Sequence, residues 1–187
     1  MSKFKHLQLL LVSLFSSASF VFSQPIGWTN IAEGGTYSAT EDLVYDENQG
    51  TILSTGLFDG TVDFDPSTGI VELTSTANYS TFIQKTDSSG NFIWCKGLYS
   101  DIQITPDKII VDDSSNVYVV GSYFGTADMD PGPGVFNIIS SGIRSGFVLK
   151  LDALGNFIWA YKIGGIENTS AHDIAFRNGK LYISGLF

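Results

Sequence analysis

The chain has 187 residues, of which 43% are hydrophobic and 13% aromatic, and its 19 acidic residues exceed 10 basic ones, for a formal net charge of −9. Such a charge disfavours binding to nucleic acid and to anionic membranes, because both need clustered lysine and arginine. The single cysteine, Cys95, cannot form an internal disulfide, so we expect a fold held by its hydrophobic core.

The first 23 residues read as a secretory signal peptide. Lys3 and Lys5 precede an apolar stretch over residues 7–15, and Val21-Phe22-Ser23 resembles the cleavage site of a signal peptidase. The apolar stretch is too short to cross a bilayer, so we expect no membrane span. The mature chain, residues 24–187, is therefore expected outside the cell, either secreted or at the cell surface, on the exterior of an outer membrane.

The mature chain opens with a segment that resembles the end of a repeated unit. Residues 28–35 are similar to residues 159–165, but nothing before them corresponds to the rest of such a unit. We therefore expect an orphan strand over residues 26–35.

Two copies of one unit follow, over about residues 42–98 and about residues 107–163. The pentapeptide GNFIW stands at 90–94 and again at 155–159, and a series of glycines, aspartates and prolines recurs at matching positions. A third copy starts at about residue 172, and the chain ends at residue 187 within its motif, so we expect a fragment of a longer protein. A period of this size indicates stacked units that cannot bury their faces alone.

Each unit reads as short strands joined by tight turns. The apolar runs 108–111, 117–120, 146–149 and 157–160 are rich in β-branched and aromatic residues and are too short for helices. Between such runs lie the segments 87–91, 112–116 and 152–156, in which aspartate can start a turn and glycine or asparagine can adopt positive φ. The runs should therefore pair as antiparallel hairpins.

Both faces of these strands are apolar, as in residues 92–95, which predicts sheets covered on both sides. Four strands with their hairpins need roughly 40 to 50 residues, which is the size of a propeller blade. We therefore predict an all-β fold of four-stranded antiparallel blades, an incomplete β-propeller. In a closed ring the orphan strand would complete the final blade.

Four segments together resemble a known family: residues 117–126, 128–134, 147–152 and 155–160 are similar to the bacterial β-propeller repeats known as SBBP repeats. The resemblance covers nearly the whole mature chain. It implies a propeller and export, and in many members of the family a C-terminal sorting signal, but it implies no particular activity.

The residues needed for nucleophilic catalysis or zinc binding are scarce. The mature chain has one histidine, His172, which we place in a turn before a strand, and Cys95 is expected in the core. Two arginines, Arg144 and Arg177, are too few for a sialidase-like site. Trp94 and Trp159 occupy matching strand positions, as expected of a core layer.

The best candidate site is a pair of aspartates in each unit, Asp63 with Asp65 and Asp128 with Asp130. Carboxylates two residues apart on an extended segment point the same way, so each pair could hold calcium with help from carbonyl groups and water. In the alternative interpretation, each Asp-Pro starts a turn and binds nothing. No other cofactor is expected.

These observations favour a secreted, non-catalytic propeller scaffold that binds an unidentified protein or glycan, or mediates adhesion at the cell surface. One alternative is a polysaccharide-active enzyme whose catalytic residues lie in other blades. Another is a calcium-stabilised structural module.

Overall fold

The computed structural model describes residues 33–187, which contain strands but no helix. The predicted signal peptide and residues 26–32 of the predicted orphan strand lie outside this part of the chain. The strands are β1 (Glu33–Gly34), β2 (Tyr37–Asp46), β3 (Thr51–Asp59), β4 (Thr61–Asp63), β5 (Glu72–Thr74), β6 (Ser80–Asp87), β7 (Phe92–Ser100), β8 (Gln103–Val111), β9 (Val117–Asp128), β10 (Asn137–Leu151), β11 (Phe157–Ile163), β12 (Ser170–Arg177) and β13 (Lys180–Leu186).

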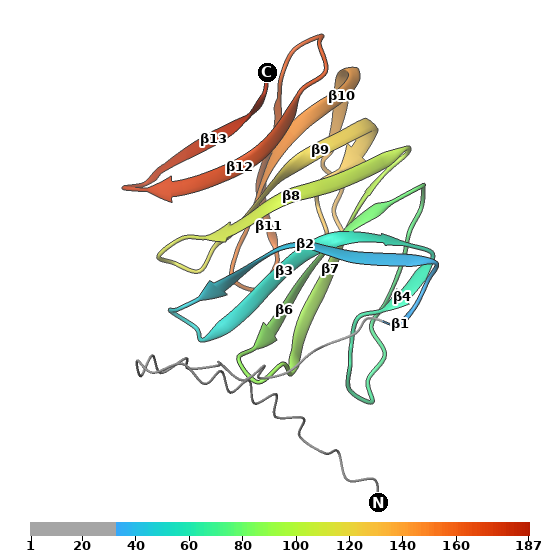
Figure 1. Ribbon diagram of the computed structural model, residues 1–187, viewed down its shortest axis with the longest axis vertical. Helices are drawn as coiled ribbons and strands as arrows, with labels where there is room; N and C mark the ends of the chain where they lie inside the picture. Colours follow the sequence, from blue (N-terminus) through green and yellow to red (C-terminus); the bar gives the residue numbers. More distant parts are fainter. Residues whose placement is uncertain (1–32) are drawn as a thin grey trace, which may run out of the picture.

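The strands form successive antiparallel sheets, so the predicted all-β, propeller-like fold is confirmed. Blade 1 has the strand order β2-β3-β6-β7, and blade 2 has the order β8-β9-β10-β11. Blade 3 is represented by the hairpin β12-β13. The first strand of each blade is its inner strand: β8 lies beside β2 on one side and β12 on the other, as Figure 1 shows.

Tight turns join the strands where they were predicted. In the segments 87–91, 112–116 and 152–156 the first aspartate accepts hydrogen bonds from backbone N–H groups two and four residues later. Gly90 and Gly155 adopt positive φ as expected, but in the third turn Ser115 does so, with φ of 61°. The predicted preference for glycine or asparagine at this turn position is therefore wrong for Ser115.

A short hairpin, β4-β5, projects from blade 1 and pairs with the strand that precedes the blade. Glu33 and Gly34 of β1 lie opposite Asp63 and Val62. In the same way the end of β7 crosses to blade 2, where Tyr99 lies opposite Asp128 and Ser100 lies opposite Ala127. Asp63 and Asp128 occupy matching positions in their repeats. Strand β1 therefore pairs with blade 1 in the same way as the end of β7 pairs with blade 2.

The core lies between the sheets. Between blades 1 and 2 it contains Leu53, Ile83 and Leu98 of blade 1, together with Tyr123, Phe147, Leu149 and further residues of blade 2. Between blades 2 and 3 it contains Tyr118, Val120, Val148, Ala171 and Ile174. Burial of each valine, leucine, isoleucine or phenylalanine among them contributes about 1.5 to 3 kcal/mol, so the blades stabilise each other by stacking.

The two matching tryptophans show the same relation. Trp94 is partly buried against the core between blades 1 and 2, and Trp159 is partly buried against the core between blades 2 and 3. Each therefore belongs to the edge of a core layer at its interblade interface.

The exposed fraction of the side chain at one repeated position depends on whether another blade packs against it. Leu53 is 0% exposed, its counterpart Tyr118 is 3% exposed, and the next counterpart, Tyr182, is 57% exposed. Leu53 and Tyr118 each face a following blade, whereas within residues 33–187 no blade follows Tyr182 on β13. The apolar faces are thus buried by their neighbours and not by their own sheet.

Candidate functional site

The second strand of every blade carries a glycine that the fold requires for close packing of backbones. A Cβ atom built on Gly121 would lie 2.8 Å from the Cα of Pro106 and closer still to the carbonyl oxygen of Thr105. The same encounter with the inner strand occurs at Gly56 and Gly185. Only glycine allows so close an approach.

Next to each glycine the inner strand contains a β-bulge. The register shifts between Thr40 and Asp42, between Pro106 and Lys108, and between Ala171 and Asp173. A bulge leaves one residue unpaired and redirects its side chain. The unpaired residues are Glu41, Asp107 and His172.

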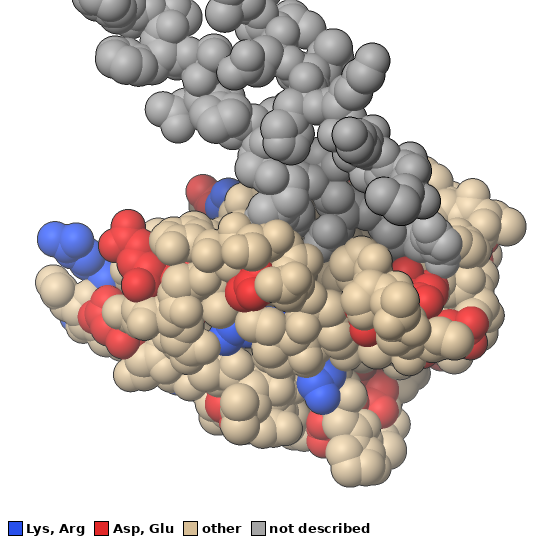
Figure 2. All heavy atoms as spheres, turned by 90° about the horizontal axis from the view of Figure 1, so that it is seen from below, with Lys and Arg blue, Asp and Glu red and all other residues tan. Residues whose placement is uncertain are grey.

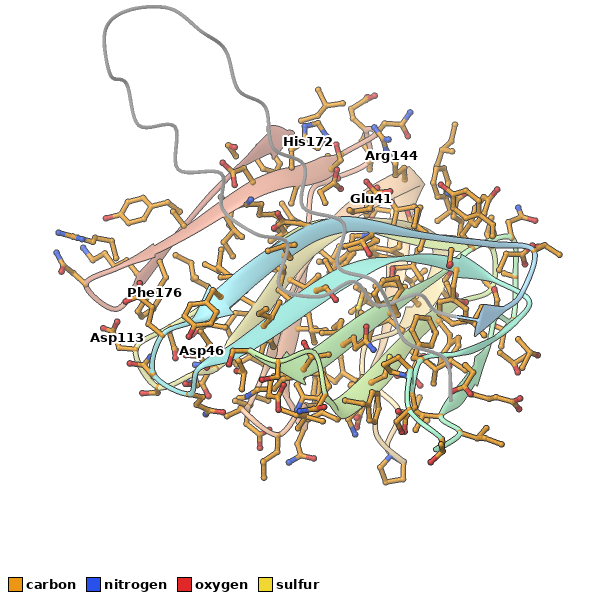
Figure 3. All side chains as sticks on the ribbon, turned by 60° about the horizontal axis from the view of Figure 1, so that its bottom comes forward. Glu41, Asp46, Asp113, Arg144, His172 and Phe176 are labelled. Carbon is orange, nitrogen blue, oxygen red and sulfur yellow. The ribbon has the colours of Figure 1, made fainter. Side chains whose placement is uncertain are left out.

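These three residues are all exposed and lie on adjacent inner strands, so the bulges place one ionisable side chain from each blade along the inner edge. Figure 3 shows Glu41 of β2, His172 of β12 and Arg144 of β10 near one another, and Asp107 interacts electrostatically with all three. The prediction that His172 lies in a turn is wrong, because β12 begins at Ser170 and His172 is its bulged residue. We call Glu41, Asp107, His172 and Arg144 the axial cluster.

The charges of the axial cluster interact. Partial removal from water raises the pKa of the Asp107 carboxyl, and the Glu41 carboxylate raises it further, while His172 and Arg144 oppose the increase. Among the described residues, neither Glu41 nor Asp107 forms an ion pair within 4 Å. Both carboxylates are therefore free to meet a ligand from solution.

The neighbouring residues fix this arrangement. Lys108 Nζ lies 3.0 Å from Asp42 Oδ1, and the backbone N–H of Ile109 donates to Asp42 Oδ2 at 2.9 Å. Asp42 and Lys108 each follow a bulged residue, so this contact ties the inner strands of blades 1 and 2 together beside the axial cluster. It accounts for a fixed spacing between Glu41 and Asp107.

The cluster does not form the machinery of a nucleophilic enzyme. His172 Nε2 is hydrogen-bonded to Ser170 Oγ at 2.5 Å, but Ser170 is buried and out of reach of a substrate. Burial raises the pKa of the Cys95 thiol, which disfavours the reactive thiolate. Within residues 33–187 no group of three His, Cys, Asp or Glu side chains is placed to hold a metal ion.

The predicted aspartate pairs lie in the hairpins at the ends of the blades. Asp63 Oδ1 accepts hydrogen bonds from the backbone N–H groups of Asp65 and Val71, at 3.0 and 2.9 Å. Asp65 Oδ1 accepts one from Ser67, and Phe64 between the two aspartates is buried. The Oδ1 atoms of both carboxylates thus stabilise the hairpin by accepting hydrogen bonds from its backbone.

The second pair repeats the first in detail. Asp128 Oδ1 accepts from the backbone of Asp130 at 3.1 Å and of Phe136 at 2.8 Å, and Asp130 Oδ1 accepts from Gly132. Met129 is buried as Phe64 is. The turn interpretation describes these contacts fully, and calcium binding at Asp63, Asp65, Asp128 and Asp130 stays a prediction.

The surface charge is dispersed. Figure 2, which views the molecule from the blade 1 side, shows acidic groups scattered among uncharged surface, with fewer basic groups. No continuous basic patch is visible on this side, in keeping with the acidic composition.

Glu41 and Asp107 were missed in the sequence, and His172 was set aside. The glycines opposite them recur visibly in each unit, and this was the available signal. The sequence does not reveal the register in which the two strands pair, and it is this register that places the bulge of the inner strand next to the glycine.

Comparison with known proteins finds no family model that matches the chain. An uncharacterized WD repeat-containing protein, L264, of Acanthamoeba polyphaga mimivirus is 28% identical over 162 residues, or 84% of this chain. The regulatory protein FlaEY of Caulobacter vibrioides is 29% identical over 102 residues, or 54% of this chain. The aligned part is 11% of the length of each of these proteins. Similarity to a protein with WD repeats agrees with the propeller-like fold of a repeat protein.

Proposed function

We propose that this protein is a non-catalytic propeller scaffold of the SBBP type that is exported and binds a protein or glycan through the axial cluster. The proposal is based on a difference between the glycines of the second strands and the bulged residues opposite them. Gly56, Gly121 and Gly185 are the same residue in every blade, whereas the bulged positions opposite them carry glutamate, aspartate and histidine. A constant frame that presents different side chains is typical of a binding surface.

Exposed apolar side chains close in sequence to the inner strands and to Arg144 support the proposal. Ile102 precedes β8, Ile166 precedes β12, and Ile143 lies in the irregular part of β10; all three are exposed. The backbone N–H of Thr169 donates to the carbonyl of Arg144, which joins the loop before β12 to the axial cluster. Charged groups together with exposed isoleucines on neighbouring segments form a surface that fits a partner of mixed polarity.

The relative named as a WD repeat-containing protein supports a scaffold that acts by interaction, since repeats of this kind present binding surfaces and not a fixed chemistry. Within residues 33–187 no helix is long and apolar enough to span a membrane. Export rests on the predicted signal peptide, and expression in a bacterial host with detection of the cleaved N-terminus by mass spectrometry would test it.

A binding screen tests the function. The full chain would be offered to a glycan array and to a set of purified surface proteins, and each ligand found would be titrated against the triple variant Glu41→Gln, Asp107→Asn, His172→Ala. We expect at least a tenfold weaker affinity for the triple variant. The control Ile93→Thr changes an exposed residue on outer strand β7 and should bind normally.

Two outcomes would contradict the proposal: no ligand at all, or a ligand that binds the triple variant as well as it binds the unmodified protein. Turnover of a polysaccharide by the purified chain would show that the protein is an enzyme and would contradict the non-catalytic scaffold.

A further inference from the structure

Blades 1 and 2 carry an aspartate and a lysine at matching positions, Asp46 with Lys85 and Asp112 with Lys150, but the hydrogen bonds of the two sites differ. In blade 2 the hydroxyl of Tyr118 donates to Asp112 Oδ2 at 2.9 Å. Lys150 Nζ lies 3.7 Å from the same oxygen and 4.9 Å from the centre of the Tyr118 ring. Asn116, at the position that Thr51 occupies in blade 1, also donates through Nδ2 to Asp112 Oδ2 at 2.9 Å, so two side-chain donors satisfy this oxygen next to the ammonium.

In blade 1 the residue matching Tyr118 is Leu53, which has no hydroxyl group. Asp46 Oδ2 and Thr51 Oγ1 are buried and have no hydrogen-bond partner among the described residues. Lys85 Nζ donates instead to Gln49 Oε1 at 2.6 Å and to the carbonyl of Ala153 in blade 2 at 3.2 Å. Two buried polar atoms are thus left where blade 2 has a closed network.

The groups concerned share one face of blade 1. Asp46 lies opposite Thr51, and Leu53 lies opposite Lys85. Because Thr51 and Leu53 are two residues apart on one strand, all four side chains point to the same side, toward blade 2. Burial lowers the pKa of Lys85 and the Asp46 carboxylate partly offsets this, so the two charges are within electrostatic reach.

An unsatisfied buried polar atom destabilises the folded state, and native proteins satisfy such atoms with ordered water where protein groups do not reach. We infer that blade 1 binds a structural water molecule that donates to Asp46 Oδ2 and bridges to Thr51 Oγ1, in the place that the Tyr118 hydroxyl occupies in blade 2.

Water fits this niche better than an ion does. The Lys85 ammonium already supplies a positive charge, which disfavours a cation, and the Asp46 carboxylate disfavours an anion. A water molecule can donate to the carboxylate and also exchange a hydrogen bond with a threonine hydroxyl. The site lies near the hydrogen bond from Lys85 of blade 1 to the carbonyl of Ala153 of blade 2. The proposed water would therefore lie at the interface between the two blades.

Crystal structures of the full chain at a resolution that shows ordered water would test the inference. We expect a peak about 2.7 to 3.1 Å from both Asp46 Oδ2 and Thr51 Oγ1. Leu53→Tyr should displace this water. Tyr118→Phe removes one of the two side-chain donors to Asp112 Oδ2 and should admit a water in place of the hydroxyl, and this second variant keeps the test open if the tyrosine at position 53 does not fit.

An unfolding measurement gives an independent readout. Thr51→Val keeps the shape of the side chain and removes its hydroxyl group, so it should raise the unfolding equilibrium constant about three- to tenfold by removing one hydrogen bond to the water. Absence of a peak in the niche, an ion at that position, or an unchanged unfolding constant for Thr51→Val would each overturn the inference.

Discussion

Replacing Gly121 by alanine would test whether the close approach of the second strand to the inner strand requires glycine. The added Cβ would lie 2.8 Å from the Cα of Pro106 and closer to the carbonyl oxygen of Thr105, and both are backbone atoms of β8. Backbone cannot yield as the end of a side chain can, so β8 would have to move away from β9. Overpacking of a core commonly costs about 1 to 3 kcal/mol, and we expect Gly121→Ala to cost about 3 kcal/mol or more.

Urea denaturation of the full chain, followed by tryptophan fluorescence, measures this loss. At a slope of about 2 kcal/mol per M, a loss of about 3 kcal/mol lowers the unfolding midpoint by about 1.5 M. Gly165→Ala is the matched control, because nothing lies within 4 Å of its added Cβ and its φ is not in the left-handed region. Equal midpoints for the two variants would refute the role assigned to Gly121.

Substitutions at three further positions test the core, the turns and calcium binding. Phe147→Ala removes a fully buried ring between blades 1 and 2 and should lower the free energy of unfolding by about 3 to 5 kcal/mol; a loss below 1 kcal/mol would contradict the stacking. Desolvation acts to raise the pKa of Asp112, but hydrogen bonds from Asn116, Tyr118 and Ser114 outweigh it and lower that pKa below 3.8. The unfolded chain therefore binds more protons there, and the stability that Asp112 provides above about pH 4 should be lost as the pH falls through its lowered pKa; in Asp112→Asn, acid titration should show a smaller loss, and an equal loss would contradict this. Asp128→Asn keeps the Oδ1 acceptor and should retain stability, whereas Asp128→Ala should lose about 1 to 2 kcal/mol. A melting point that rises with calcium in the unmodified protein but not in Asp128→Asn would instead support the calcium site.

The repeated sequence predicted much of this fold because its signals are local. The turn at 87–91 needs an aspartate that bonds to nearby N–H groups and a glycine with positive φ, and both can be read from the sequence. The two-sided apolar strands likewise indicated stacked sheets. Ser115 shows the limit of this reasoning, since the surrounding structure holds a serine where glycine or asparagine was expected.

The candidate site was less accessible because it depends on pairing between distant segments. Glu41, Asp107 and His172 have no common sequence motif, and they become equivalent only once each inner strand is aligned with its glycine. The crossing of β7 to Asp128 is likewise a long-range pairing that periodicity does not reveal. The aspartate pairs were found because both lie in repeated local motifs, and their hydrogen bonds are local too.

A disulfide placed between blades tests the stacked arrangement most directly. Ser100 of β7 lies opposite Ala127 of β9, and paired residues on antiparallel strands have Cα atoms about 4.5 to 5.5 Å apart, which a disulfide can bridge. In a Cys95→Ala background, Ser100→Cys with Ala127→Cys should oxidise to one intramolecular bridge, detected by non-reducing peptide mapping. Ser100→Cys with Ser114→Cys, which pairs the end of β7 with the turn between β8 and β9, should remain reduced. Efficient bridging of the first pair alone is the predicted result; no bridge in the first pair, or equal bridging in both, would contradict the stacking of repeated blades.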